Sequence, residues 1–172
     1  KKSCIVNRDK VFLKVTELLE RINHEELSFL NIKFETRSEY AIEYLNDILL
    51  EYANIYGLTP QIFVSGKGHR KSIWQRHYQE LEGYRDRLLK YAKHIEVCGE
   101  NRNSYSKTDH GATFMRIKTD YMGNDQLLPA YNMQVAVCDE YIAAIDVKQY
   151  ATDMDCFVPL MDKFHQLYGH YP

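Results

Sequence analysis

Six aspartates in the second half of the chain have the side-chain chemistry to bind divalent metal ions. They are Asp109, Asp120, Asp125, Asp146, Asp153 and Asp155. Metal-assisted phosphoryl transfer needs several carboxylates that converge within a few ångströms, usually from neighbouring strands and a helix. Of the six, Asp146 alone lies in a segment with a strand pattern, so solvated or helix-capping carboxylates are the better interpretation. The spacing therefore predicts no catalytic residue and no metal site.

Histidines and cysteines do not add a metal site by their spacing. The seven histidines form no HxxxH pair, and the cysteines at positions 4, 98, 138 and 156 form no CxxC pair, so zinc has little support. His77 falls on the apolar stripe of a predicted helix and is interpreted as a core histidine rather than a ligand. The thiols are expected to be reduced and mostly buried.

A basic turn is the best candidate for binding. Residues 66–72 read GKGHRKS, but a phosphate-binding P-loop needs the order GxxxxGK[ST] between a strand and a helix. Here the order differs and the preceding element is helical. The turn and the following helix instead predict contacts with the phosphate backbone of a nucleic acid. The predicted contact residues are Lys67, Arg70, Lys71 and Arg76. A basic turn that only caps the helix is the alternative.

The charge is unevenly distributed along the chain. The formal net charge is −2, but residues 67–93 hold eight Lys and Arg against three Asp and Glu, whereas residues 139–163 hold six acidic residues against two Lys. This pattern suits a nucleic-acid binder with a metal-using core, with two solvated faces as the alternative. No apolar run approaches the roughly 18 residues that span a membrane, so a cytoplasmic protein without membrane partners is expected.

Three long amphipathic helices are predicted in the first hundred residues, because apolar residues recur there at spacings of three and four. The stripes are Val11, Val15, Leu18, Leu19 and Ile22; Ala41, Tyr44, Leu45, Ile48, Leu49 and Tyr52; and Trp74, His77, Leu81, Tyr84, Leu88, Tyr91 and Ile95. Asn23 is a possible break or cap. Thr36 and Glu39 have the spacing of a capping box, and Gly57 and Gly99 are expected to end helices. The helices predict an antiparallel bundle.

A different pattern follows. Residues 101–129 show no period and predict an irregular connection. Residues 131–138 alternate apolar with other residues, as a strand does, and 141–147 form a second β-rich run after a turn at Asp139-Glu140. A helix is predicted from 153 to 168. Its expected buried face is Phe157, Leu160, Met161, Phe164 and Leu167.

Two segments resemble a known family. Residues 102–118 read RNSYSKTDHGATFMRIK, and residues 124–137 read NDQLLPAYNMQVAV. Together they resemble the central block of bacterial insertion-sequence transposases of the DDE type, which reads RNSYSKTDxDATFMRxK and then NGQLKPAYNVQxAV. Thr152-Asp153 and Pro159 follow at the expected place, and 66–72 resembles the basic linker of the family. Gly111 stands where the family usually has Asp, and Asp125 where it usually has Gly.

The resemblance implies an α+β fold with an RNase H-like core. Residues 1–100 would be a helical insertion region, 101–129 an irregular connecting segment, and 130–172 a partial RNase H-like unit with a β-hairpin and a helix. The three catalytic acids would lie outside the chain, which starts at Lys1 without Met and is expected to be an internal fragment. The intact protein would use Mg²⁺ or Mn²⁺ to cut and rejoin transposon-end DNA by phosphoryl transfer. This fragment would be a non-catalytic scaffold.

Two further expectations concern partners. An RNase H-like hairpin without its neighbouring strands would have an open edge, so two copies are expected to form a homodimer by pairing strand edges. The alternative is that the helical insertion or residues 101–129 fold over the edge and keep the chain monomeric. The alternative to a transposase is a non-enzymatic helical DNA-binding or interaction module. Flanking coding sequence with an Asp-bearing strand upstream and an ADxGY-like strand downstream would distinguish the two.

Overall fold

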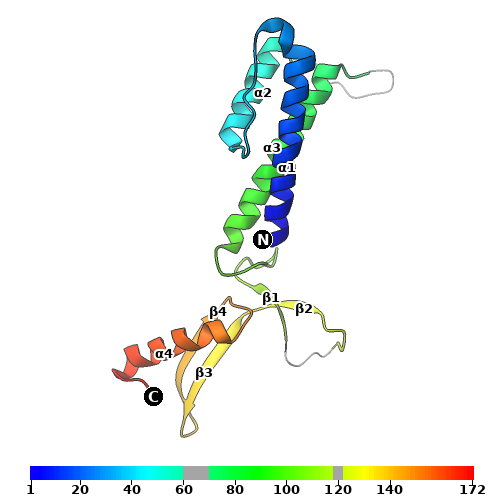
Figure 1. Ribbon diagram of the computed structural model, residues 1–172. Helices are drawn as coiled ribbons and strands as arrows, with labels where there is room; N and C mark the ends of the chain where they lie inside the picture. Colours follow the sequence, from blue (N-terminus) through cyan, green and yellow to red (C-terminus); the bar gives the residue numbers. More distant parts are fainter. Residues whose placement is uncertain (60–69, 118–121) are drawn as a thin grey trace. The chain divides into compact units, whose positions relative to one another are not determined.

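The computed structural model describes residues 1–59, 70–117 and 122–172. The chain divides into two compact units: residues 2–95 form a helical unit, and Lys1 with residues 96–172 forms a sheet unit. Long packed helices come first, and two antiparallel two-stranded sheets and a last helix follow, which confirms the predicted α+β class (Figure 1). No helix in the described ranges is long and apolar enough to cross a membrane.

The first helix, α1 (Lys2–Ile22), buries the apolar stripe that the sequence predicts. The α-helical geometry ends at Ile22, so Asn23 does mark a break in the α-helix, but the chain stays helical beyond it. The chain continues as a π-helical turn (Asn23–Leu27) and a 3-10 turn (Ser28–Leu30), and it leaves the helical path at Asn31, whose φ is 53°. The Asn23 amide holds the next segment, because it donates to the carbonyl and accepts from the amide of Phe34, both at 2.8 Å.

An extended segment, residues 32–41, returns along α1. Thr16 Oγ1 lies 3.2 Å from the carbonyl oxygen of Arg37 and 2.8 Å from Tyr40 Oη. The predicted capping box of Thr36 and Glu39 is wrong. Both residues are exposed in this extended segment, and the second helix begins only after Ala41, without a side-chain cap.

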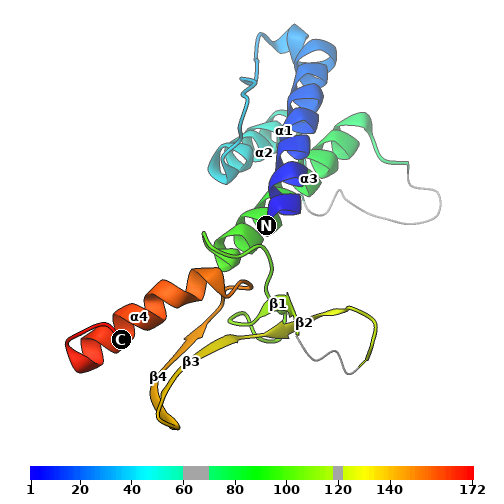
Figure 2. The same ribbon diagram turned by 60° about the horizontal axis from the view of Figure 1, so that its bottom comes forward.

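Helix α2 (Ile42–Tyr56) runs in the same direction as α1, because the extended segment has already carried the chain back. The start of α2 lies near the middle of α1, where the rings of Tyr40 and Phe12 are 6.1 Å apart, and its end reaches Glu26 through Tyr52. Helix α3 (Ile73–Cys98) runs against both (Figures 1 and 2). The predicted antiparallel bundle is therefore correct for α3 and wrong for the pair α1 and α2.

The stripes of α2 and α3 form the rest of the helical core. Leu45, Ile48, Leu49 and Tyr52 are buried on α2, and His77, Leu81, Tyr84 and Leu88 are buried on α3. Gly57 ends α2 in a left-handed conformation at φ 59°, as predicted, and Gly99 follows α3 at φ 61°. A proline follows three positions after Gly57, and this Pro60 lies outside the described residues.

A buried carboxylate, that of Glu26 in the π-helical turn, connects α1 to α2 and α3. Its side chain is 4% exposed and that of His77 is 8% exposed. One carboxylate oxygen bonds to His77 Nδ1, and the other accepts from Tyr52 Oη at 2.5 Å. Burial and this hydrogen bond raise the pKa of Tyr52. His77 is thus a core histidine with a partner, as predicted, and the three side chains satisfy one another where water is excluded.

The sheet unit contains two hairpins. Strands β1 (Thr113–Arg116) and β2 (Leu127–Ala130) pair antiparallel, with Thr113 opposite Ala130. The prediction of an irregular segment at 101–129 is therefore wrong for these residues. Strands of four residues, one of them containing Pro129, are too short to show the alternation that identifies longer strands.

The second hairpin agrees with its prediction. Strands β3 (Asn132–Cys138) and β4 (Tyr141–Lys148) pair antiparallel, with a register shift between Ala136 and Val137. Asp139 and Glu140 form the turn with φ of 45° and 70°. This is the geometry of a tight hairpin turn that glycine and asparagine adopt more easily.

Helix α4 (Met154–Tyr168) packs on one face of this second hairpin. Its buried residues are Cys156 and Leu160, whereas Phe157 and Leu167, which the sequence predicts to be buried, are about 60% exposed. The predicted buried face is therefore wrong for these two residues. A sheet of two strands is narrow and covers only a thin strip of a helix that carries apolar side chains on several sides.

We expect Glu26→Leu to lower the free energy of unfolding of the helical unit by about 2–5 kcal/mol, because His77 and Tyr52 would both keep buried polar atoms without a partner. Glu25→Leu, an exposed neighbour in the same turn, is the matched control and should stay within about 0.5 kcal/mol. Urea unfolding followed by circular dichroism measures both. Equal midpoints for the two variants would show that the buried carboxylate is not needed.

Candidate nucleic-acid interface

The start of α3 is built by a capping box that the sequence analysis did not identify. The Ser72 amide donates to Gln75 Oε1 at 3.0 Å, and the Gln75 amide donates to Ser72 Oγ at 3.2 Å. These reciprocal bonds satisfy two backbone amides that have no partner within the helix. The S-x-x-Q spacing is visible in the sequence, and it fixes where the basic turn joins the helix.

Three of the four predicted contact residues lie around this capped helix start. Arg70 and Lys71 precede the helix and Arg76 lies in its first turns, and all three are exposed. Lys71 Nζ donates to Gln79 Oε1 at 2.7 Å. In the described part of the chain none of the three forms an ion pair with an acidic residue. The fourth predicted residue, Lys67, lies outside the described residues.

The electrostatics of this helix start favour an anion. The first turn of α3 contains no acidic residue. The amino end of a helix carries a partial positive charge, which repels the nearby side-chain cations. A bound anion would be attracted to both and would offset this repulsion. Further along α3, by contrast, Arg85 is already paired with Asp86, at 2.7 Å. The cations of the helix start are therefore better placed to receive phosphate groups.

Arg102, the first residue of the segment with the family resemblance, closes the other end of α3. Its guanidinium donates to the carbonyl oxygens of Val97 at 2.6 Å, Cys98 at 3.2 Å and Gly111 at 3.1 Å. The first two are among the last carbonyls of the helix, which have no partner in the helix itself. Arg102 thus joins the helix end to the loop before β1.

Asp109 holds the same loop. Its carboxylate accepts from Tyr131 Oη at 2.9 Å and from the Gly111 amide at 2.9 Å. These hydrogen bonds lower the pKa of the Asp109 carboxyl from its ordinary value of 3.8, and the bond from Tyr131 has the largest effect. A Cβ at Gly111 would collide with Tyr131 Oη, so the glycine leaves room for the phenol.

A cleft of about 520 Å³ lies beside these residues and is lined mainly by the two segments with the family resemblance. Its polar side chains are partly paired: Asp153 Oδ1 accepts from Asn132 Nδ2 at 3.0 Å and from Gln134 Nε2 at 3.3 Å. Arg116, also in the lining, is 3.3 Å from Asp125. The contacts of Asp153 connect β3 to the segment before α4, and the contact of Arg116 connects β1 to the residue pair before β2, so we interpret these residues as structural.

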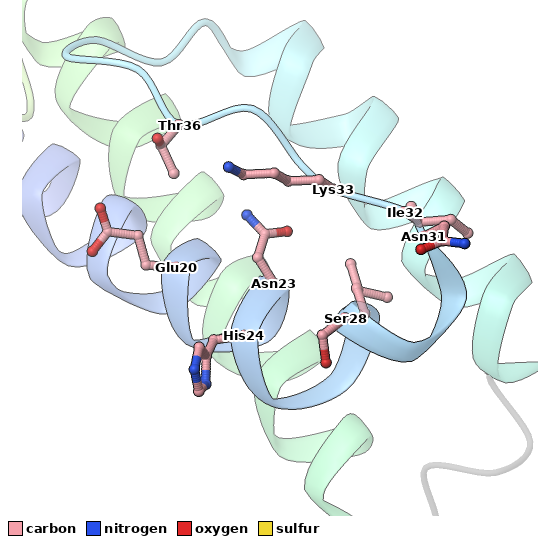
Figure 3. A pocket seen from close by; sticks show the side chains of 9 residues that line it. Glu20, Asn23, His24, Ser28, Asn31, Ile32, Lys33 and Thr36 are labelled. Atoms are coloured by element: carbon pink, nitrogen blue, oxygen red, sulfur yellow. The ribbon is translucent and has the colours of Figure 1, made fainter.

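A cavity of about 580 Å³ lies in the helical unit, between α1 and the returning segment (Figure 3). Its lining mixes an acid, Glu20, with a cation, Lys33, and neutral side chains including Thr36. The Asn23 amide in the lining is already bonded to Phe34. A surface of mixed charge does not suit a polyanion, and we assign no ligand to this cavity.

The described residues do not fit a metal ion. No three His, Cys, Asp or Glu side chains gather within the described ranges. Asp146 on β4 is 8% exposed, but two cations face it, with Lys148 Nζ at 3.1 Å and Lys163 Nζ at 3.6 Å. Because two ammonium groups already compensate the charge of this carboxylate, it is a poor ligand for a divalent cation.

No family model, curated protein or solved structure matches this chain. The resemblance of residues 102–118 and 124–137 to transposases therefore rests on those residues themselves.

The Asp109 loop gives a prediction about pH. Because the folded pKa of Asp109 is lowered, its contribution to stability is present above pH ~4 and is lost as pH falls through the folded pKa. Tyr131→Phe removes the donor and should raise the Asp109 pKa towards 3.8, as measured by NMR titration of the carboxyl carbon. Gly111→Ala should act in the same direction, because it displaces the phenol.

Tyr141→Phe is the matched control for these two variants, since Tyr141 lies at the turn of the second hairpin and is 79% exposed. It should leave the Asp109 titration unchanged. If the Asp109 pKa were the same in Tyr131→Phe and the unmodified chain, the hydrogen bond would not be responsible for the shift.

Proposed function

We propose that this chain is part of a DDE-type DNA transposase, in which it provides scaffold and DNA backbone contacts but no catalytic acid. The observation that carries the proposal is the pair of segments 102–118 and 124–137. Their length and order resemble the transposase block far more specifically than a short motif would.

The bonding of these segments supports the proposal. Arg102, Asp109, Tyr131, Asn132 and Gln134 all bond to backbone groups or to other side chains of the sheet unit. Residues that hold one another in this way are expected to recur together wherever the same local fold is needed. A resemblance made of structural residues is compatible with a part that performs no chemistry.

We further propose that β3, β4 and α4 are part of an RNase H-like core. An antiparallel hairpin followed directly by a helix that packs on it is the order that the resemblance implies. On this proposal residues 2–95 are the helical insertion. In the intact protein Mg²⁺ or Mn²⁺ would support phosphoryl transfer at transposon-end DNA. No step of that reaction is assigned to the described residues, because they do not fit a metal ion.

For the DNA contact we propose the exposed cations at the start of α3. Phosphate contacts position a protein on DNA without reading sequence, so binding through these residues would be weak and independent of sequence. The second candidate function is a non-enzymatic helical DNA-binding or interaction module. It is favoured by one observation, namely that residues 2–95 enclose a hydrophobic core of their own.

Neutralising the four cations should weaken binding to a fluorescein-labelled DNA duplex at least about tenfold at low salt. The variant replaces Lys67, Arg70, Lys71 and Arg76 with Gln. Fluorescence anisotropy over a salt series should also show a shallower slope of log K against log salt, by up to ~0.9 for each phosphate that the variant no longer neutralises.

The matched control removes the same charge from exposed lysines elsewhere in the helical unit, with Gln at Lys2, Lys10, Lys14 and Lys33. It should bind nearly as the unmodified chain does. Equal weakening by both variants would mean that only net charge matters, and no weakening by the first would remove the proposed interface.

The chain alone should not cut DNA. Supercoiled plasmid incubated with the chain and Mg²⁺ or Mn²⁺ should show no nicking above a no-protein background. Asp146→Ala is the informative comparison, because Asp146 is the acidic residue that lies on a strand in the part of the chain that the structure describes. Cleavage that Asp146→Ala abolishes would contradict the proposal that the catalytic acids lie elsewhere.

A further inference from the structure

The second hairpin exposes an entirely apolar face. Three cross-strand pairs form it: Met133 with Val147, Val135 with Ile145, and Val137 with Ile142. Exposed fractions run from 40% at Val135 to 64% at Met133 and Val137. We call these six side chains the open face. Their combined exposed area is on the order of 600 Å², which is at the upper limit for the largest apolar patch on a typical monomer.

Helix α4 covers the opposite face of the hairpin, which is the more polar one. The pairs there are Gln134 with Asp146 and Ala136 with Ala144, and Ala144 and Asp146 are buried. Sheets with one covered face usually place the apolar side chains under the cover and the polar ones in water. Here the larger apolar side chains lie on the uncovered side, so the hairpin needs a second cover.

The chemistry of the open face restricts what that cover is. It has no charged side chain, so it offers nothing to the phosphates of a nucleic acid. The adjoining turn is acidic, with Asp139 and Glu140, which disfavours an anionic lipid surface. An apolar sheet face matches another apolar sheet face, because sheets pack face to face at about 10 Å.

We propose that the open face packs against the open face of a second copy of this chain. The two faces would bury on the order of 1,200 Å² together, which is where specific protein interfaces begin. A two-fold axis makes such a contact self-complementary, with the Val135–Ile145 pairs of both copies at its centre. This inference concerns the 172-residue chain by itself and rests on neither the proposed DNA contact nor the proposed RNase H-like core.

Charge selects the orientation of the two copies. If both hairpins pointed the same way, the two acidic turns, each with Asp139 and Glu140, would meet. With the axis at right angles to the strands, the two acidic turns lie at opposite ends of the contact, and the turn of one copy lies over the Asn132 and Lys148 ends of the partner's strands. The Met133–Val147 end of one copy then covers the Val137–Ile142 end of the other.

Pairing through strand edges, which the sequence analysis expects, is the main rival. In β4 the carbonyl oxygens of Ile145 and Ala143 already accept bonds from α4, from Lys163 Nζ at 2.6 Å and Tyr168 Oη at 3.1 Å. Those carbonyls are less available to a strand of another copy. The open face has no such competing contact.

Sedimentation equilibrium of the full 172-residue chain tests the proposal with Val135→Lys. The unmodified chain should show a reversible monomer–dimer equilibrium, and Val135→Lys should raise the dissociation constant at least about tenfold, because it places two lysines at the centre of the contact. Val158→Lys, at an apolar α4 residue that is 61% exposed, is the matched control and should dimerise normally. Circular dichroism establishes that both variants fold.

Two outcomes overturn the proposal. One is an unmodified chain that stays monomeric at several hundred micromolar. The other is a dimer that Val135→Lys does not weaken more than Val158→Lys, since a lysine on the face leaves the strand edges free. Neutralising the turn with Asp139→Asn and Glu140→Gln should not strengthen the dimer. A clear strengthening would show that the two turns meet and that the orientation is wrong.

Discussion

Apolar surface must be removed from water, and the two units of this chain meet that constraint to different extents. In the helical unit, α1, α2, α3 and the returning segment enclose one core. Residues as far apart in sequence as Phe12 and Leu88 belong to it. In the sheet unit, a two-stranded hairpin has one helix on one side and six apolar side chains exposed on the other. A lone hairpin of this kind is marginal in water.

The difference suggests a division of roles. A closed core with a buried Glu26, His77 and Tyr52 network holds the three helices together, and a capping box fixes where α3 begins. Cations whose backbone is already ordered lose less conformational freedom when they contact phosphates. The sheet unit is held by local bonds, such as those of Arg102 and Asp109, and its remaining apolar face is suited to a protein partner.

The helices and the longer hairpin could be predicted from the sequence, because periods of 3.6 and 2 report burial on one side. The capping box could not be assigned by spacing alone: Thr36 with Glu39 and Ser72 with Gln75 fit the same pattern, and only the path of the backbone decides between them. The contact of Asp109 with Tyr131 joins residues 22 positions apart and depends on the fold. Which residues of α4 are buried depends on the width of the sheet on which the helix packs. The spacing of apolar residues in the helix gives no information about that width.

Hydrogen exchange of the full chain, followed by mass spectrometry, tests the division of roles most directly. It would be measured with and without duplex DNA and at two protein concentrations. DNA should slow exchange at the start of α3, around residues 70–80, and a higher protein concentration should slow exchange in β3 and β4, residues 132–148. DNA protection of 132–148 without any change at 70–80 would contradict this division of roles.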